Sequence, residues 1–213
     1  MSKKVMVISV HPDDETLGAG GAILKHQKAG DQVYCLYITK GNDEQALIME
    51  KVNFIYNFTE TFCLDLRDLY LDDLSLNDII PLISKIFNQI KPEIIFIPNR
   101  SDVHSDHRKI YSALLACTKS FRYPYIKKVL MMEVQSETDF APPLPENAFL
   151  PNVFYDITDV YDKKMSVMKL YESELLPDGF TRSLRSIEAQ NQYRGSQINA
   201  LYAEAFMLIK EIN

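Results

Sequence analysis

Runs of apolar residues without polar alternation recur along the chain, and most are followed by a polar turn and then by helical spacing. Such a run predicts a strand that is covered on both faces, as in a parallel sheet. The strands predicted in this way are 5–10, 32–39, 61–64, 93–98 and 128–133. The helices predicted between them begin near Thr16 or span 43–58, 79–90 and 108–117. This alternation predicts a three-layer α/β/α domain with a mostly parallel sheet.

The pattern changes in the last third of the chain. The proline-rich segment 141–151 is predicted to be a long loop that borders a substrate site. From Val160 onward the spacing predicts mostly helix, with a break at 177–179 and a last helical segment over 183–212. We therefore expect one domain over 1–213 with a helical C-terminal part.

Composition limits the classes of partner. The chain has 213 residues and a net charge of −6, which suits one buried core and argues against nucleic acid or an anionic membrane surface as a partner. No segment has the length for stable membrane insertion, and the first apolar run is too short for a signal peptide. We expect a cytoplasmic protein with a small-molecule substrate.

The three cysteines, Cys35, Cys63 and Cys117, are interpreted as reduced core thiols.

Two polar stretches follow predicted strands and contain three of the four histidines. One is His11-Pro12-Asp13-Asp14-Glu15, and the other runs from Asn99 to His107. The carboxyl ends of parallel strands meet at one edge of a sheet, where ligands bind. Acidic residues at a helix start can also act only as caps. Histidines that cluster with carboxylates at this edge favour a metal site instead.

His11, Asp14 and His107 can supply the three protein ligands of a catalytic zinc ion, with one position left for water. A bound metal lowers the pKa of its water and polarises a carbonyl, as amide hydrolysis requires. Asp13 is then the candidate general base and acid. His104, if protonated, is the candidate for stabilising the oxyanion, and it lies three residues before His107.

These motifs resemble those of the LmbE-like or PIG-L family of zinc-dependent N-acetylglucosamine deacetylases. Later segments are also similar to that family: 133–138, 149–152, 156–159, 163–164, Tyr171, 194–195 and 202–206. The resemblance implies a Rossmann-like fold and removal of an N-acyl group, usually acetyl, from an amino sugar or its conjugate. It also implies the same zinc ligands, the same roles for Asp13 and His104, and an orienting role for Asp106 toward a histidine.

The chain departs from the family in one respect. Many relatives carry a substrate-binding arginine in the helix after the second strand, and 42–45 offers none here. Arg100, Asp102 and Glu137 are weaker candidates for substrate contacts. Three other features are predicted to be structural or solvated: the block 194–195 packs the last helix, 163–164 is a solvated helix face, and His26 is solvated.

Three alternatives remain open. The substrate could be a sugar-thiol conjugate with an amide other than acetyl. Two histidines and one carboxylate are also the ligands of non-haem iron(II) oxygenases, so Fe²⁺ is an alternative metal. A metal-binding or sugar-binding protein without turnover is the third alternative. We also expect a homo-oligomer.

Overall fold

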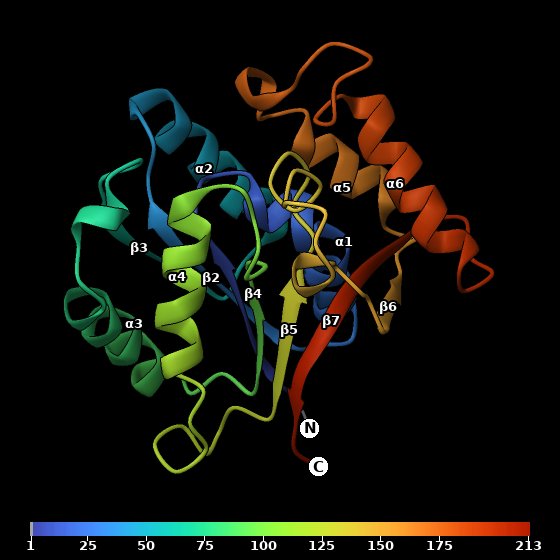
Figure 1. Ribbon diagram of the computed structural model, residues 1–213. Helices are drawn as coiled ribbons and strands as arrows, with labels where there is room; N and C mark the ends of the chain where they lie inside the picture. The colour runs from blue at the N-terminus through green and yellow to red at the C-terminus, as the bar shows by residue number, and fades with distance from the viewer. Residues whose placement is uncertain (1) are drawn as a thin grey trace.

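The computed structural model describes residues 2–213 and contains one seven-stranded sheet. Its strand order is β3-β2-β1-β4-β5-β7-β6, and the strands from β1 to β5 are parallel (Figure 1). The bounds are β1 Lys4–Ser9, β2 Gln32–Thr39, β3 Glu60–Leu66, β4 Ile94–Ile97, β5 Lys128–Met132, β6 Val153–Asp156 and β7 Ala203–Glu211. All five strands expected from the sequence are present.

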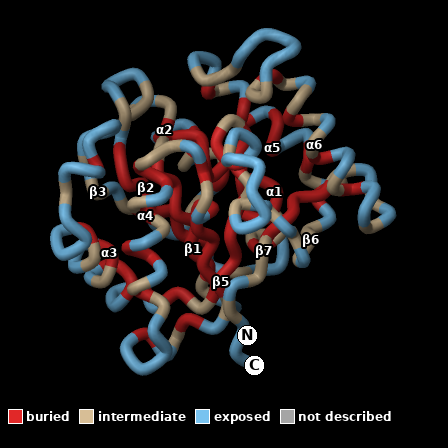
Figure 2. The backbone as a smooth tube through the Cα atoms, viewed as in Figure 1, coloured by how far each residue is buried: buried red, intermediate tan, exposed pale blue. Residues whose placement is uncertain are grey.

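Helices cover both faces of the sheet. Their bounds are α1 Asp14–Lys28, α2 Asp43–Tyr56, α3 Leu76–Ile90, α4 Ser105–Ala116, α5 Tyr161–Met168 and α6 Leu184–Ser196, with 3-10 turns at Leu71–Asp73, Pro145–Asn147 and Glu172–Glu174. In β1, Val5 and Val7 pack under α1, while Met6 and Ile8 pack under α3 and α4. Figure 2 shows the buried sheet between exposed outer surfaces. The expected three-layer α/β/α architecture is confirmed.

Glycines let α1 lie close to its neighbours. A Cβ atom on Gly21 would stand 2.4 Å from Cγ2 of Ile157, and one on Gly18 would stand 3.0 Å from Cβ of Met132. These separations leave no room for a side chain, so the glycines set the distance between α1 and the elements around it. This packing fixes the position of the helix start, which carries the first polar stretch.

The helical prediction for the C-terminal part is wrong over its last segment. Helix α6 ends at Ser196, and Ala203–Glu211 forms β7, which pairs antiparallel with β5 and β6. The first residues of β7, 203–206, are all buried. The apolar run that follows Glu204, 205–209, is too short to show a periodicity that separates a strand from a helix. β6 also arises in a segment for which no strand was expected.

Two side chains that were predicted to be solvated are buried. Lys164 is fully buried, and its Nζ lies 2.8 Å from Oε1 of Glu204. His26 is 9% exposed, with Nδ1 at 2.7 Å from Asp31 and Nε2 at 3.1 Å from the hydroxyl of Tyr155. In both cases a partner distant in sequence supplies the compensating polar group, which the local pattern cannot reveal.

The cysteine prediction is correct for two of three residues. Cys35 and Cys117 are buried free thiols, whereas Cys63 is exposed on the edge strand β3. Among residues 2–213, no helix combines the length and the apolar character needed to cross a bilayer.

Candidate metal and catalytic site

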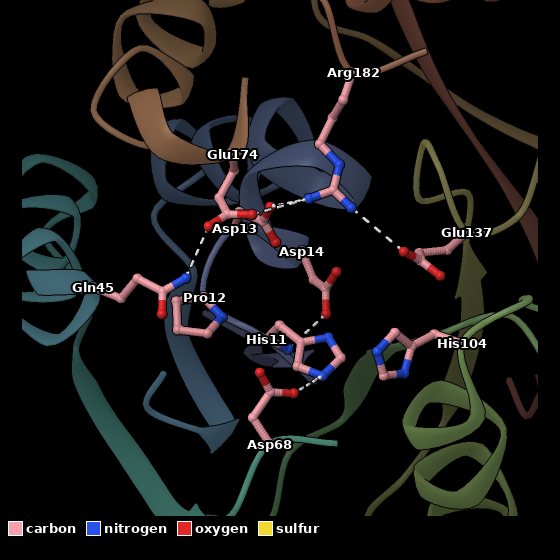
Figure 3. Close-up of a pocket in the computed structure, with 10 residues that line it drawn as sticks. All are labelled: His11, Pro12, Asp13, Asp14, Gln45, Asp68, His104, Glu137, Glu174 and Arg182. Atoms are coloured by element: carbon pink, nitrogen blue, oxygen red, sulfur yellow. Dashed lines mark hydrogen bonds and ion pairs between the residues drawn. The ribbon is translucent and has the colours of Figure 1, made fainter. Parts of the chain in front are cut away.

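The polar stretches after β1 and β4 meet at the carboxyl edge of the sheet and border a pocket of about 160 Å³ (Figure 3). Its walls come from four further segments, which are the start of α2, the loop after β3, the loop after β5 and the region before α6. The lining residues are His11, Pro12, Asp13, Asp14, Gln45, Asp68, His104, Glu137, Glu174 and Arg182.

Asp13 occupies the residue before α1 with φ of 133°, a conformation that favours glycine. Its backbone N–H donates to Oε2 of Glu15 at 3.2 Å, and its own side chain makes no capping hydrogen bond. Glu15 is buried and accepts further hydrogen bonds from Ser9 and Tyr171, at 2.9 Å and 2.8 Å. The turn therefore holds the Asp13 carboxylate toward the pocket instead of onto the helix, which argues against a purely capping role.

Donor atoms of His11, Asp14 and His107 converge beside Asp13. Nε2 of His107 lies 3.3 Å from Nδ1 of His11 and 3.4 Å from Oδ2 of Asp14, and the three donors lie within 4.8 Å of one another. Two imidazole nitrogens and one carboxylate oxygen form a donor set suited to zinc or iron(II).

Carboxylates contact the far side of each histidine. Nδ1 of His107 lies 2.8 Å from Asp102, while Nε2 of His11 lies 3.0 Å from Asp68 and 3.3 Å from Asp106. Such contacts place the proton on the ring nitrogen that faces the carboxylate. They leave the lone pair of the other ring nitrogen free for a metal. The carboxylates around His11 and His107 therefore hold both rings in the form that binds a metal ion.

A second group of possible donors, His11, Asp68, His104 and Asp106, also lies within 4.8 Å. It would use Nε2 of His11, the atom that already contacts both carboxylates. The Asp68 side chain is 46% exposed, whereas Asp14 and His107 are buried. The group with His11, Asp14 and His107 is therefore the better enclosed of the two.

The pKa values of the adjacent Asp13 and Asp14 are shifted in opposite directions. Burial alone would raise the pKa of Asp14, but the charge and hydrogen bond of His107 lower it, together with backbone N–H groups of Val10 and His11 at 2.9 Å and 2.8 Å. Burial and the charge of Asp14 raise the pKa of Asp13 well above its usual range. Asp14 is thus held as a carboxylate, and Asp13 has the greater affinity for a proton.

Arg182 lies over the catalytic aspartate candidate. Its Nη1 is 3.1 Å from Oδ2 of Asp13 and 3.3 Å from Glu174, and its Nη2 is 3.4 Å from Glu137 (Figure 3). The charge of Arg182 opposes the rise in the pKa of Asp13. This contact joins residues 169 positions apart, and no sequence motif marked Arg182.

His104 precedes α4 and lines the pocket. Its Nδ1 accepts the backbone N–H of Asp106 at 3.1 Å, which leaves Nε2 as the protonated nitrogen. Burial lowers the pKa of His104, and the charges of His11 and His107 lower it further. These effects favour the neutral ring, which still offers one N–H donor, although the sequence analysis assigned the oxyanion role to a protonated ring.

The three candidate substrate contacts lie in different environments. Glu137 lines the pocket, and its Oε2 is buried without a hydrogen-bond partner among the described residues. Asp102 was also a candidate; it is fully buried, contacts Nδ1 of His107 and does not line the pocket. Arg100 is exposed and does not line the pocket.

Four pocket residues were not identified as site residues by the sequence analysis: Gln45, Asp68, Glu174 and Arg182. Asp68 follows the end of β3, so its place at the carboxyl edge was the one available signal. Gln45 lies in the first turn of α2 and donates to Glu174 at 2.9 Å. Arg194, by contrast, pairs with Glu133 at 2.7 Å outside this pocket.

Comparisons with known proteins agree with these motifs. Residues 6–118 match the family described as PIG-L, GlcNAc-PI de-N-acetylase. An uncharacterized deacetylase of Escherichia coli, YaiS, is 25% identical over 183 residues, which cover 80% of this chain and 91% of that protein.

Solved structures share the fold at lower identity. The N,N'-diacetylchitobiose deacetylase of Pyrococcus horikoshii has a TM-score of 0.77 and 19% identity, over 98% of this chain and 84% of its own. GalB of Pseudomonas putida, a 4-carboxy-2-hydroxymuconate hydratase, has a TM-score of 0.74 and 20% identity, over 99% and 98%. Because the fold thus also carries a hydratase, the assignment depends on the matched sequence. That match covers more than half of the chain, including both histidine stretches, and the chain belongs to the PIG-L family of deacetylase-type hydrolases.

Proposed function

We propose that this protein is a metal-dependent hydrolase that removes the N-acetyl group from an N-acetylglucosamine-type amino sugar or its conjugate. The observation that carries this proposal is the convergence of His11, Asp14 and His107 beside Asp13, whose side chain makes no capping hydrogen bond to α1. The three residues are the proposed ligands of Zn²⁺, with Fe²⁺ as the alternative metal. When bound, the metal supplies Lewis acidity and lowers the pKa of its water.

The chain's own groups divide the remaining work. The carboxylate of Asp13 takes a proton from the attacking water and returns it to the leaving amine, a role that its raised pKa favours. Nε2–H of His104 donates to the oxygen of the tetrahedral intermediate. Asp102 and Asp106 hold His107 and His11 in the required orientation.

Charge in the pocket supports a neutral or cationic amino sugar as substrate. The lining includes five carboxylates, and three of them, Asp13, Glu137 and Glu174, already pair with the guanidinium of Arg182. An anionic substrate would meet like charges at short range. The buried free oxygen of Glu137 is an acceptor for a hydroxyl or ammonium of the sugar. The diacetylchitobiose named for the Pyrococcus protein is such a neutral sugar.

The experiment measures acetate released by the zinc-loaded protein from a panel of N-acetylglucosamine compounds. A chelated sample and Asp13→Asn are run beside it, with zinc content measured in each. We expect release by the zinc-loaded protein, none by the chelated sample, and none by Asp13→Asn although zinc stays bound. Turnover by Asp13→Asn at the rate of the unmodified protein would contradict the mechanism.

The same samples separate the alternatives. An iron(II) oxygenase requires oxygen and a co-substrate, whereas hydrolysis proceeds without oxygen. A sugar-thiol conjugate is tested by adding it to the panel, and binding without any product would indicate a non-catalytic protein. The cytoplasmic location and the homo-oligomer stay predictions, the latter tested by light scattering.

A further inference from the structure

A second cavity, of about 470 Å³, opens beside the catalytic pocket. Phe140, Leu176 and Phe180 form its apolar surface, and all three are exposed. Glu174 and Arg182 also line the catalytic pocket, so the two hollows share a wall.

The polar groups of this second cavity are largely engaged with one another. The hydroxyls of Ser136 and Thr181 lie 2.7 Å apart, and Nε of Arg182 donates to Ser136 at 3.3 Å. Ser173 donates to Glu174 at 3.3 Å. Few donors or acceptors are therefore free for sugar hydroxyls, and the surface best suits an apolar group.

Two phenylalanine side chains of this cavity are largely exposed to solvent. Phe140 is 60% exposed and Phe180 is 56% exposed, on two different loops that face one cavity. Apolar surface that lies in a concave site with a polar rim marks a ligand site more often than isolated exposed residues do. A ligand that covered both rings would gain binding free energy from the burial of their apolar surface.

Arg182 determines how one ligand could occupy both cavities. Its Nη1 bonds Asp13 and Glu174, while its Nε bonds Ser136, so a single guanidinium forms the boundary between them. The catalytic pocket, at about 160 Å³, is too small for a large conjugate. A substrate bound there by its acetamide would extend past Arg182 toward Phe140 and Phe180.

We propose that the second cavity binds the apolar aglycone, aryl or alkyl, of an N-acetylated amino-sugar glycoside whose acetamide lies in the catalytic pocket. The inference rests on the proposed function for the position of the acetamide. The family description specifies an acetyl group as the part removed. Because an acetyl group is too small to reach the second cavity, we assign the apolar group to the aglycone.

The test compares phenyl and methyl N-acetyl-β-D-glucosaminides by kcat/KM, in the unmodified protein, in Phe180→Ala and in Phe121→Ala. Phe121 is also an exposed phenylalanine, lies in the segment between α4 and β5 outside both cavities, and serves as the control. We expect the phenyl glycoside to be preferred by about tenfold or more, from the buried ring. Phe180→Ala should lose most of this preference, and Phe121→Ala should keep it.

Binding without turnover separates this inference from the proposed function. Calorimetry with phenyl and methyl β-D-glucosides, which carry no amide, reports on the second cavity even if no acetate is ever released. Tighter binding of the phenyl glucoside that depends on Phe180 supports the cavity. Acetate release with equal kcat/KM for both glycosides would overturn it and leave the deacetylase proposal intact. A Phe180-dependent preference only for longer N-acyl groups, or only for a second sugar ring, would overturn the assignment to an aglycone.

Discussion

Asp102 and His107 form a fully buried pair in which Oδ2 of the carboxylate lies 2.8 Å from Nδ1 of the ring. Thr138 donates a second hydrogen bond to Asp102 at 2.7 Å, so the carboxylate itself is fixed in place. This pair determines which nitrogen of His107 faces Asp14 and His11. It explains why a carboxylate without access to the pocket matters for the proposed metal site.

We expect Asp102→Asn to weaken zinc binding by about 10- to 100-fold, because the amide orients and polarises the ring less well than the carboxylate. Zinc affinity measured by competition with a chelating dye checks this. Asp72→Asn, a change in an exposed 3-10 turn outside the pocket, is the matched control and should bind zinc as the unmodified protein does. Equal zinc affinity of Asp102→Asn and Asp72→Asn would refute the orienting role.

Backbone strain at Asp13 gives a second prediction. With φ of 133°, any residue that has a Cβ is strained there, whereas glycine is not. Asp13→Gly should therefore be more stable than Asp13→Ala by about 1–3 kcal/mol, although we expect both variants to lack activity. Urea unfolding of the two variants measures the difference. Because both remove the carboxylate and its contact with Arg182, the comparison isolates the backbone. A more stable alanine variant would contradict the strain.

The buried ion pair between Lys164 and Glu204 gives a third prediction. Glu204 also accepts backbone N–H groups of Gly21 and Ala22 at 2.7 Å and 2.8 Å, and the ammonium of Lys164 donates to the carbonyl of Leu17 at 3.2 Å. The pair thus attaches the middle of α1 to α5 and β7. Lys164→Met leaves an uncompensated buried carboxylate and should destabilise the protein by about 3–5 kcal/mol.

A double-mutant cycle with Glu204→Gln measures this coupling, and the double variant should be less destabilised than the sum of the single variants. The exposed pair of Lys25 and Asp159, 2.8 Å apart on the outer end of α1, provides the control. Lys25→Met should change the free energy of unfolding by less than about 1 kcal/mol. Strict additivity for Lys164 and Glu204 would show that the pair is not the source of the stability.

The sequence predicts those parts of the site that lie within one local pattern, an apolar run followed by polar residues. Apolar runs mark β1 and β4, and the polar residues that follow them must lie at one edge of a parallel sheet, so His11 and His107 could be brought together in advance. Arg182 could not, because a lone arginine in a loop has no periodicity and reaches Asp13 only through the packing of the C-terminal part.

The residues whose predicted environment was wrong also depend on contacts outside their own segment. Lys164 and His26 were expected in solvent because charged and polar residues on helices usually are, and only the fold supplies Glu204 and Tyr155 as partners. The strand β7 was predicted to be helix, because its apolar run 205–209 is too short for its periodicity to distinguish a strand from a helix. In each case the missing information lies in contacts between distant segments, which a single sequence does not specify.

His26 gives a prediction for the dependence of stability on pH. Burial lowers its pKa below 6.5, although the hydrogen bond with Asp31 partly opposes this. The unfolded chain then binds more protons than the folded chain as the pH falls below about 7, so the free energy of unfolding should decrease by at most about 1.4 kcal/mol per pH unit from this residue. The loss begins near pH 6.5 and ends below the folded pKa.

Urea unfolding at pH 7.5 and pH 5.5, with the unmodified protein and His26→Gln, isolates this contribution. The histidines of the site titrate in both proteins and cancel in the comparison. The lowered pKa of Asp31 lies below this range, so Asp31 stays charged at both pH values. The unmodified protein should lose more stability than His26→Gln between the two pH values. An equal loss would mean that His26 is protonated to the same extent in the folded and unfolded chains, and that the enclosure by Asp31 and Tyr155 does not exclude the charged ring.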